Sequence, residues 1–556
     1  MGEGVGRSPV GLLMGAGPVQ RIVDARSTRF AELLKRSGTV GNPAEAAAAS
    51  VRRALLSALV AVPAACLLGA LFSPWLLVPA LAPLAFVLGP ELRLRDLVAQ
   101  RKEGVERELP FFATMVSVLG GAGVPLYSVL RELAGEEAFA WLGKEARLVK
   151  RDVDVLGMNP YESFERLAET HPSRRFADFL LGYTSKARSG GDVPFYLVEE
   201  SGGLLADLED GWTRYVARVG IVGSMMITVF GIVPLLLMVV GVFSPGVSIV
   251  GLLVFTGVGV PAFTVALLFM TGRMQPAREE GVRGRAAAAM ALALPAALTG
   301  VLTKLAWVGV ASALLAFFVL YGASVREQLS ETRGVDEGLA RFLRDLLEYK
   351  RQEYDLSKAV VALEARGRYN PHFSRLLARV AAQLRAGVPL DEVRVECRSS
   401  LGKTTFLLLG QMSRSGGGTV DTVYQMSSFA GKLTGMRQKA GTEMKPYLVL
   451  SYVSPLLLAF GVTFVQGVLT SFSGRVAPGF SALRVSGIQL GTVPPGLPQV
   501  SDLLIVVSAA SLGLIGAKIS DLTVKNTLRA SLNVALAVAA VGLMAALGPH
   551  SLTGAL

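Results

Sequence analysis

Long stretches without charge dominate this sequence. Residues 54–90 hold no charged side chain in 37 positions, and residues 219–272 hold none in 54. Because roughly 20 apolar residues cross a bilayer as one helix, each stretch is long enough for two short spans. With 51% hydrophobic and only 18% charged residues, the chain is too apolar for a soluble multidomain enzyme. We therefore predict an all-α polytopic membrane protein. Its net charge of +12 is first of all a topology signal, and it does not imply nucleic-acid binding.

A second feature is a tandem repeat. The stretch FLLGYTSKARSGG at 179–191 returns as FLLLGQMSRSGG at 406–417. Arg188 recurs at Arg414 and Gly157 at Gly387, which gives offsets of 414 − 188 = 226 and 387 − 157 = 230. Apolar positions recur with the same offset of 230, namely Leu109, Phe112, Val116, Leu126 and Leu133 against Leu339, Phe342, Leu346, Leu356 and Leu363. A near-constant offset across landmarks of different chemistry predicts duplication of a domain-sized unit.

The charge-free runs and the repeat divide the chain into soluble and membrane segments. Breaks at 73–75, 244–246 and 303–305 each divide one apolar run into two spans, which gives six spans. Three further spans follow, so the sequence predicts about nine transmembrane helices. The predicted segments are a cytoplasmic N-terminal segment with an amphipathic helix (1–53), transmembrane hairpin 1 (54–90), cytoplasmic helical domain 1 (91–218), transmembrane helices 3 and 4 (219–272), transmembrane hairpin 2 (286–323), cytoplasmic helical domain 2 (324–445), transmembrane helix 7 (446–469), an external loop (470–501) and transmembrane helices 8 and 9 (502–549).

Positive charge assigns the two sides of the membrane. With the N-terminus inside, the basic loops at 273–285 and 518–529 and both soluble domains fall in the cytoplasm. The external turns then hold only Lys304, Arg475 and Arg484 as basic residues, and the C-terminus lies outside. We expect Lys304, in a polar turn, to reach the headgroups, with a functional intramembrane lysine as the alternative.

The sequence offers little chemistry. The two cysteines and three histidines lie in spacings that suit neither a disulfide framework nor a metal site. The segment from Cys397 to Thr404 resembles the phosphate-binding pattern G-x-x-x-x-G-K-[ST] but lacks its first glycine. That pattern also needs a buried strand before it, whereas the preceding VPLDEVRVE is typical of a helix on a polar surface. We predict no catalytic, cofactor-binding or metal-binding residues, no cofactor, and a protein that is not an enzyme.

The second soluble domain is more basic than the first. Residues 91–218 hold 17 basic and 21 acidic side chains, whereas residues 324–445 hold 20 and 14. Between 366 and 445 the count is 13 basic against 5 acidic. The end of this stretch, just before a span, is a candidate docking face for an acidic protein or for anionic headgroups, with a partner-free positive flank as the alternative. Its basic residues are Lys432, Arg437, Lys439 and Lys445.

With the repeat in view, the chain resembles the type II secretion system F family, the polytopic platform proteins of type IV pilus-like machines. The resemblance rests on two A-G-V-P-L elements at 122–126 and 386–390, each expected to open a helix, and on two R-S-G-G turns at 188–191 and 414–417. Bacterial members often carry a glutamate-containing G-E-x-G in the latter place, whereas this chain has Lys186 to Asp192 and Ser413 to Gly418. With nine predicted spans, the chain is more similar to the archaeal branch, the platform of the archaellum or of an archaeal adhesive pilus.

The resemblance implies a homodimeric membrane platform. Its cytoplasmic domains would dock on a hexameric secretion ATPase, and its spans would hold or pass pilin or archaellin subunits. The double-glycine turns would then permit unusual backbone angles during movement, with plain helix C-caps as the alternative. The residues expected to dock the ATPase are Arg188, Gly190, Gly191, Arg414, Gly416, Gly417, Lys432, Arg437, Lys439 and Lys445.

Two other functions compete. A secondary transporter or permease is compatible with a repeat, but the near absence of charge within the spans and the large soluble domains argue against it. A membrane scaffold for an unrelated cytoplasmic partner is the third hypothesis. Substrate flux in a reconstituted system would favour the transporter, and the absence of a secretion ATPase or pilin encoded nearby would favour the scaffold.

Overall fold

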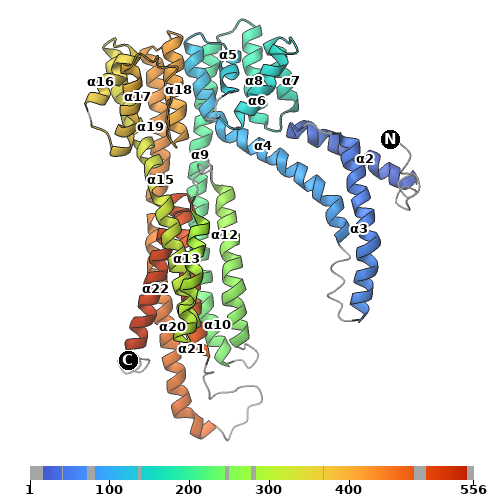
Figure 1. The fold of residues 1–556 in the computed structure, drawn as a ribbon, viewed down its shortest axis with the longest axis vertical. Coiled ribbons are helices and arrows are strands. Elements are labelled where there is room, and N and C mark those ends of the chain that lie inside the picture. The colour runs from blue at the N-terminus through green and yellow to red at the C-terminus, as the bar shows by residue number, and fades with distance from the viewer. Residues whose placement is uncertain are drawn as a thin grey trace. The chain divides into compact units, whose positions relative to one another are not determined.

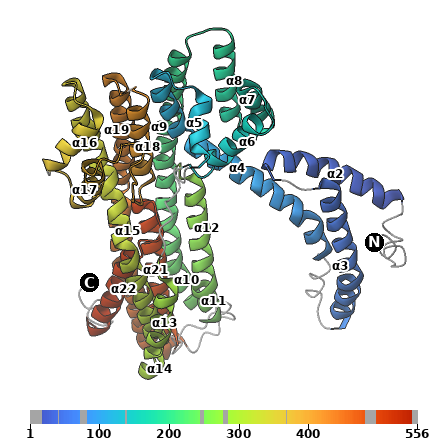
Figure 2. The same ribbon diagram turned by 45° about the horizontal axis from the view of Figure 1, so that its top comes forward.

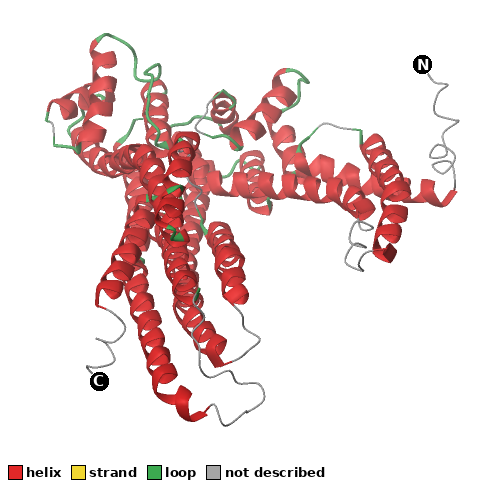
Figure 3. Cartoon of the chain, turned by 60° about the horizontal axis from the view of Figure 1, so that its bottom comes forward, coloured by secondary structure: helices red, strands yellow, loops and turns green. Residues whose placement is uncertain are grey.

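The computed structural model describes residues 17–39, 42–71, 82–135, 139–243, 249–276, 284–366, 368–416, 418–480 and 496–547. Within these ranges the regular structure is helical and contains no strand (Figure 3), so the all-α prediction is confirmed. The chain forms two compact units, Met1–Leu204 and Leu205–Leu556.

The first unit contains an N-terminal arm and a helical bundle (Figure 1). Its helices are α2 (Gly17–Ser37), α3 (Pro43–Leu71), α4 (Ala82–Gly121), α5 (Leu126–Leu133), α6 (Leu142–Asp154), α7 (Pro160–Thr170), α8 (Arg174–Arg188) and the beginning of α9 (Val193–Ile227). The expected amphipathic helix is α2, which packs against α3 and α4 and buries Phe30. Figure 2 shows α2 lying across the end of α3. The structure thus shows the apolar face of this helix packed on other helices of the same unit.

Apolar residues at helical spacing build the core of the first bundle. Leu109, Phe112 and Val116 lie on one face of α4 and are fully buried. Phe112 meets Phe179 of α8 edge to face, with 5.8 Å between ring centroids. Such aromatic pairs add about 0.5–1.5 kcal/mol beyond the burial of their area. The five core positions predicted from the repeat in this bundle are all at most 1% exposed.

The second unit contains the remainder of α9, most of the membrane helices and a second bundle. Its further helices are the π-helical turn η2 (Thr228–Ile232), α10 (Val233–Phe243), α11 (Ile249–Val254), the π-helical turn η3 (Phe255–Gly259), α12 (Val260–Met274), α13 (Ala286–Ala297), α14 (Thr299–Thr303), α15 (Ala306–Arg351), α16 (Leu356–Ala365), α17 (Pro371–Arg385), α18 (Ser400–Arg414), α19 (Val420–Glu443), α20 (Lys445–Phe480), α21 (Leu497–Asp521) and α22 (Leu528–Leu547). The second bundle consists of the C-terminal half of α15 with α16, α17, α18 and α19.

Seven helices of the described ranges are long and apolar enough to cross a membrane. They are Val193–Met238, Val250–Met274, Ala286–Thr303, Ala306–Arg351, Val420–Val468, Leu497–Asp521 and Leu528–Ala546. Each contains one of the predicted spans three to nine. The predicted hairpin at 54–90 corresponds to α3 and α4, and residues 72–81 between them lie outside the described residues. The seven spans make this a multi-pass membrane protein.

Helix α21 is the centre of the membrane part of the second unit. It packs against α20, α22, α15 and α12, and 78% of its most apolar window is buried. Small residues allow the close approach, since a Cβ at Gly513 would lie 2.4 Å from the Cα of Ala530 on α22. In contrast, only 6% of the corresponding window of the hairpin helix Ala286–Thr303 is buried. Lys304 ends this helix in the left-handed region, with φ of 57°, and is exposed in the turn where the sequence placed it.

The two bundles repeat several unusual details at the predicted offset. Phe342 meets Phe406 at 5.8 Å between centroids, the same separation as in the Phe112 pair. Gly157 and Gly387 both have positive φ, 66° and 89°. At the position of Gly123, whose φ is 79°, the second bundle has Glu353 with φ of 62°. Positive φ favours glycine because a Cβ then crowds the backbone.

Replacing Glu353 by glycine should therefore stabilise the second bundle by about 0.5–1 kcal/mol, because relief of the left-handed strain outweighs the added freedom of the unfolded chain. The matched change in the first bundle, Gly123→Ala, should destabilise by about 1 kcal/mol. The measurement is the thermal midpoint of the full-length protein in detergent. A lower midpoint for Glu353→Gly would contradict the argument.

Two sequence-based boundaries are wrong. Helix α20 continues to Phe480 and α21 begins at Leu497, so the predicted loop at 470–501 is helical at both ends. The segment VPLDEVRVE at 388–396 is not helical. The reason lies in Gln383 of α17, whose side-chain amide accepts from Arg394 N at 3.0 Å and donates to Arg394 O at 3.1 Å. This amide satisfies the backbone N–H and C=O of Arg394, which therefore do not need helical partners.

Candidate functional site

The first R-S-G-G turn is a helix C-cap. Helix α8 ends at Arg188, and Gly190 follows with φ of 69°. The backbone N–H of Gly191 donates to Lys186 O at 3.0 Å, as in a Schellman motif. Arg188 is exposed at the surface and its guanidinium lies 3.0 Å from Glu165. Glycine at position 190 is thus explained by the cap geometry.

The second R-S-G-G turn has the same form. Helix α18 ends at Arg414, Ser415 N donates to Gln411 O at 2.9 Å, and Gly416 has φ of 68°. Gly417 lies outside the described residues. Of the two alternatives left open by the sequence, the structure shows C-caps at both turns. The arginine that precedes each cap is exposed.

The opposite ends of α8 and α18 share a second motif. Ser173 caps α8 by accepting from Phe176 N, and its hydroxyl donates to Glu106 at 2.9 Å. Ser399 caps α18 by accepting from Gly402 N at 2.9 Å, and its hydroxyl donates to Asp336. Each capping serine therefore joins the start of a helix to a carboxylate on the long helix beside it. This cap also explains Gly402-Lys403-Thr404 as the first turn of a helix, with no strand before it among the described residues.

The four basic residues before the seventh span do not form one face. Arg437 turns inward, and its Nη1 lies 2.5 Å from Asp336, which is only 7% exposed. Lys432 and Lys439 instead line a groove together with residues of α9. Lys445 is exposed at the first residue of α20. Arg437 therefore stabilises the bundle, whereas the three exposed lysines are available to a partner.

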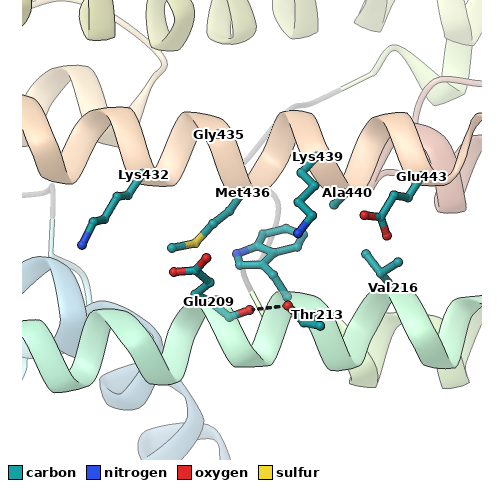
Figure 4. A pocket seen from close by; sticks show the side chains of 10 residues that line it. Glu209, Thr213, Val216, Lys432, Gly435, Met436, Lys439, Ala440 and Glu443 are labelled. Atoms are coloured by element: carbon teal, nitrogen blue, oxygen red, sulfur yellow. Dashed lines mark hydrogen bonds between the residues drawn. The ribbon is translucent and has the colours of Figure 1, made fainter.

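The groove lies between α9 and α19 (Figure 4). Trp212 of α9 and Met436 of α19 are buried along its floor, at 4% and 8% exposure. Glu209 and the two lysines extend into it from facing helices. Its volume is about 270 Å³, and its lining residues are Glu209, Trp212, Thr213, Val216, Lys432, Gly435, Met436, Lys439, Ala440 and Glu443. The sequence gives no sign that α9 contributes to this groove, because only the tertiary structure brings α9 beside α19.

A second site that the sequence did not reveal is a buried ion pair in the first unit. Arg101 of α4 makes a two-pronged contact with Glu145 of α6, at 2.8 and 2.5 Å. Its third nitrogen donates to the carbonyl oxygen of Arg36 at 2.8 Å, near the C-terminus of α2. His171 lies 3.8 Å from the same carboxylate. The Arg101–Glu145 pair therefore holds α2, α4 and α6 together. It is not a catalytic group, because both side chains are buried and a substrate could not reach them.

The electrostatics of Glu145 agree with that role. Burial alone would raise the pKa of its carboxyl group, but the hydrogen bonds and charges of Arg101 and His171 outweigh burial and hold the pKa below its ordinary value. Glu108 differs. It accepts from the backbone N–H groups of Trp141 and Leu142, yet burial dominates and raises its pKa. In the described part of the chain no cluster of three or more His, Cys, Asp or Glu side chains could hold a metal ion.

The structure therefore defines a class of protein, a polytopic helical membrane protein that carries helical bundles outside the apolar layer. The comparisons with known proteins add a family. Residues 111–241, from α4 of the first bundle into the following span, match the family described as type II secretion system (T2SS), protein F. This match supports the resemblance to the type II secretion system F family that the sequence indicated. It is a membrane component of secretion- or pilus-type machinery.

A curated relative comes from an archaeon. A protein of Methanocaldococcus jannaschii, itself described as uncharacterized, is 19% identical over 417 residues, which cover 66% of this chain and 70% of the relative. The similarity extends well beyond the segment matched by the family. No solved structure matches the chain.

Proposed function

We propose that this chain is the assembly platform of an archaeal type IV pilus-like machine, either an archaellum or an adhesive pilus. In this proposal its bundles couple a cytoplasmic hexameric secretion ATPase to the insertion of pilin or archaellin subunits into a growing filament. The observation that carries the proposal is the T2SS protein F match at 111–241, on a helical bundle that leads directly into a membrane span. The archaeal relative supports the choice of branch.

The helices themselves suggest how movement would be transmitted. Helix α15 runs without interruption for 46 residues from a membrane span into the second bundle. At 1.5 Å per residue it is roughly 69 Å long. Because its backbone hydrogen bonds are continuous, a displacement applied to the bundle would move the span as well. We propose that the ATPase displaces the bundles and that the spans thereby shift a bound subunit.

The repeated details of the two bundles support a further part of the proposal, the origin of the chain by tandem duplication. The N-cap serines, the Phe pairs and the positive-φ positions recur where the offset places them. We also propose that the N-terminus is cytoplasmic and the C-terminus external, that two copies form the platform, and that the chain itself catalyses no reaction and needs no cofactor.

The docking surface that we propose for the ATPase includes the two capped turns, with Arg188, Gly190 and Gly191 in the first bundle and Arg414, Gly416 and Gly417 in the second. In the second unit, Gly416 precedes Pro446, the start of the apolar span, by 30 residues, most of them in α19. This places the turn roughly 45 Å from the membrane along that helix. A cytoplasmic ring can reach such a turn without meeting headgroups.

The test uses the full-length protein in nanodiscs and the secretion ATPase of the same organism, at low and high salt. The double variant Arg188→Glu and Arg414→Glu should weaken binding at least tenfold, since reversing two interface charges adds repulsion. The matched control is Arg174→Glu, at the other end of α8, where the side chain is 94% exposed. If wild type binds no ATPase, the scaffold function replaces the platform. Substrate flux without filament machinery would favour a transporter.

A further inference from the structure

A groove at one end of the membrane hairpin α13–α14–α15 combines an apolar channel with a single cation. Figure 2 shows α14 at the end of α15 that is remote from the second bundle. The volume of the groove is about 520 Å³, which is within the range of small-ligand sites. Its lining residues are Ala297, Gly300, Val301, Lys304, Ala306, Gly309, Val310, Ala313 and Leu314. Lys304 is thus the one charged residue in an otherwise apolar lining.

Two glycines give the groove its floor, because they bring the helix backbones together. A Cβ at Gly300 would lie 2.8 Å from the Cα of Gly309, and one at Gly309 would lie 2.7 Å from the carbonyl oxygen of Ala297. The floor is therefore backbone without side chains, and the larger Val301 and Leu314 line the groove beside it. The lining positions recur at spacings of three and four residues on both helices, so the groove follows the helix axes.

The groove runs from the membrane surface into the apolar layer. The span Ala286–Thr303 crosses the membrane in 18 residues, and Lys304 follows it directly, so this lysine lies at headgroup level. Ala297 precedes Lys304 by 304 − 297 = 7 residues, or about 10 Å of helix. Because the hydrocarbon core is about 30 Å thick, this length is about two-thirds of the depth of one leaflet. Only 6% of the apolar window of this span is buried, so the groove is open to acyl chains.

The charge at the mouth of the groove is uncompensated. Lys304 is the only charged residue between Arg285 and Arg326, and among the described residues it has no ion-pair partner. The N-terminus of α15 begins two residues later and has no side-chain cap. The positive end of a helix dipole favours anions, so it adds to the attraction of the lysine. The membrane-surface end of the groove is therefore electropositive, whereas the rest of its lining is apolar.

We infer that this groove binds an anionic phospholipid from the leaflet opposite to the second bundle. The phosphate would contact the ammonium group of Lys304, and one acyl chain would lie along the glycine floor beside Val301 and Leu314. No carboxylate occurs between Arg285 and Arg326, so the amine of a zwitterionic headgroup would have no partner here. A second copy docked through the same face would bring two Lys304 side chains together, since a twofold contact uses the same patch on both subunits. The inference does not depend on the platform function.

The experiment is native mass spectrometry of the full-length protein in detergent. Phosphatidylglycerol, phosphatidylcholine and inorganic phosphate are added in separate titrations. Lys304→Gln should lower retention of phosphatidylglycerol about tenfold, because the charge-assisted contact to the phosphate is lost. Arg285→Gln is the matched control, since this arginine is exposed at the other end of the same hairpin helix and does not line the groove. It should change retention less than about twofold.

Ala297→Leu tests the apolar part of the site separately. Leucine at this exposed lining position fills the channel and should also lower phosphatidylglycerol retention, whereas Ala291→Leu, exposed on the same helix outside the groove, should not. All four variants should keep the thermal midpoint of wild type.

Three results would overturn the inference. The first is equal retention of phosphatidylglycerol by Lys304→Gln and wild type, or a loss in Arg285→Gln as large as in Lys304→Gln, which would indicate a general attraction of anionic lipid. The second is equal retention of phosphatidylcholine and phosphatidylglycerol by wild type. The third is retention of inorganic phosphate that depends on Lys304, together with normal lipid retention in Ala297→Leu, because the site would then bind a free anion.

Discussion

Replacing Arg101 by methionine should destabilise the first unit by about 3–5 kcal/mol, because the change leaves the carboxylate of Glu145 buried without its cation. Glu145 is 2% exposed and Arg101 5%, so water cannot easily compensate for the loss. The variant also removes the hydrogen bond to Arg36 O, and we expect the C-terminus of α2 to become sensitive to protease. The measurements are the thermal midpoint of the full-length protein and limited proteolysis near Gly38.

The matched control is Arg36→Met. This side chain pairs with Glu32 at 2.9 Å, but both partners are more than half exposed. Such i,i+4 pairs contribute only about 0.3–0.5 kcal/mol, and the carbonyl oxygen that Arg101 binds is retained. If the two methionine variants have equal midpoints, the clamp interpretation is wrong.

Acid should reproduce part of the effect of Arg101→Met. The pKa of Glu145 is lower in the folded protein than its ordinary value, which is about 4.3 in the unfolded chain. A lowered folded pKa means that the carboxylate contributes stability above the unfolded pKa, and that this contribution is lost as the pH falls through the folded pKa. The thermal midpoint of wild type should therefore fall below about pH 4. In Glu145→Gln this part of the pH dependence should be absent.

The sequence predicted the parts of the fold that depend on local pattern. Apolar residues at helical spacing identified Phe112 and Phe342 as core positions, and both are fully buried. Charge-free runs located seven spans that the described residues contain. Glycine marked the left-handed positions at 190 and 416 because few other residues adopt them. In each case a property of a few neighbouring residues determines the structure.

Other features depend on residues far apart in sequence. Asp336 and Arg437 are 101 positions apart, and Arg101 and Glu145 are 44 apart. Nothing in either neighbourhood distinguishes these side chains from solvated charges. The polar pattern of the irregular segment at 388–396 allows a helix, whereas the amide of Gln383 on another helix takes up the backbone hydrogen bonds of Arg394. Glu353 likewise gives no sign of its positive φ in its residue type.

The Asp336–Arg437 pair changes how the docking of a partner should be tested. Arg437→Leu should destabilise the second bundle by about 2–3 kcal/mol, since a charge-assisted bond to a buried carboxylate is lost. The figure is lower than for Arg101 because the Arg437 side chain is about one-third exposed. The thermal midpoint of the full-length protein should fall accordingly. A charge-reversed Arg437 would therefore lose any partner by unfolding the bundle, whether or not the residue touches that partner.

A double variant separates the two roles. Replacing Asp336 and Arg437 together by leucine removes the buried charge with its partner, and such apolar replacements are often neutral or stabilising. The double variant should therefore recover most of the midpoint lost in Arg437→Leu. If ATPase binding then returns as well, Arg437 acts only inside the bundle. If stability returns but binding does not, Arg437 is part of the docking surface, as the sequence suggested. An unchanged midpoint in Arg437→Leu alone would contradict the assignment of this pair as structural.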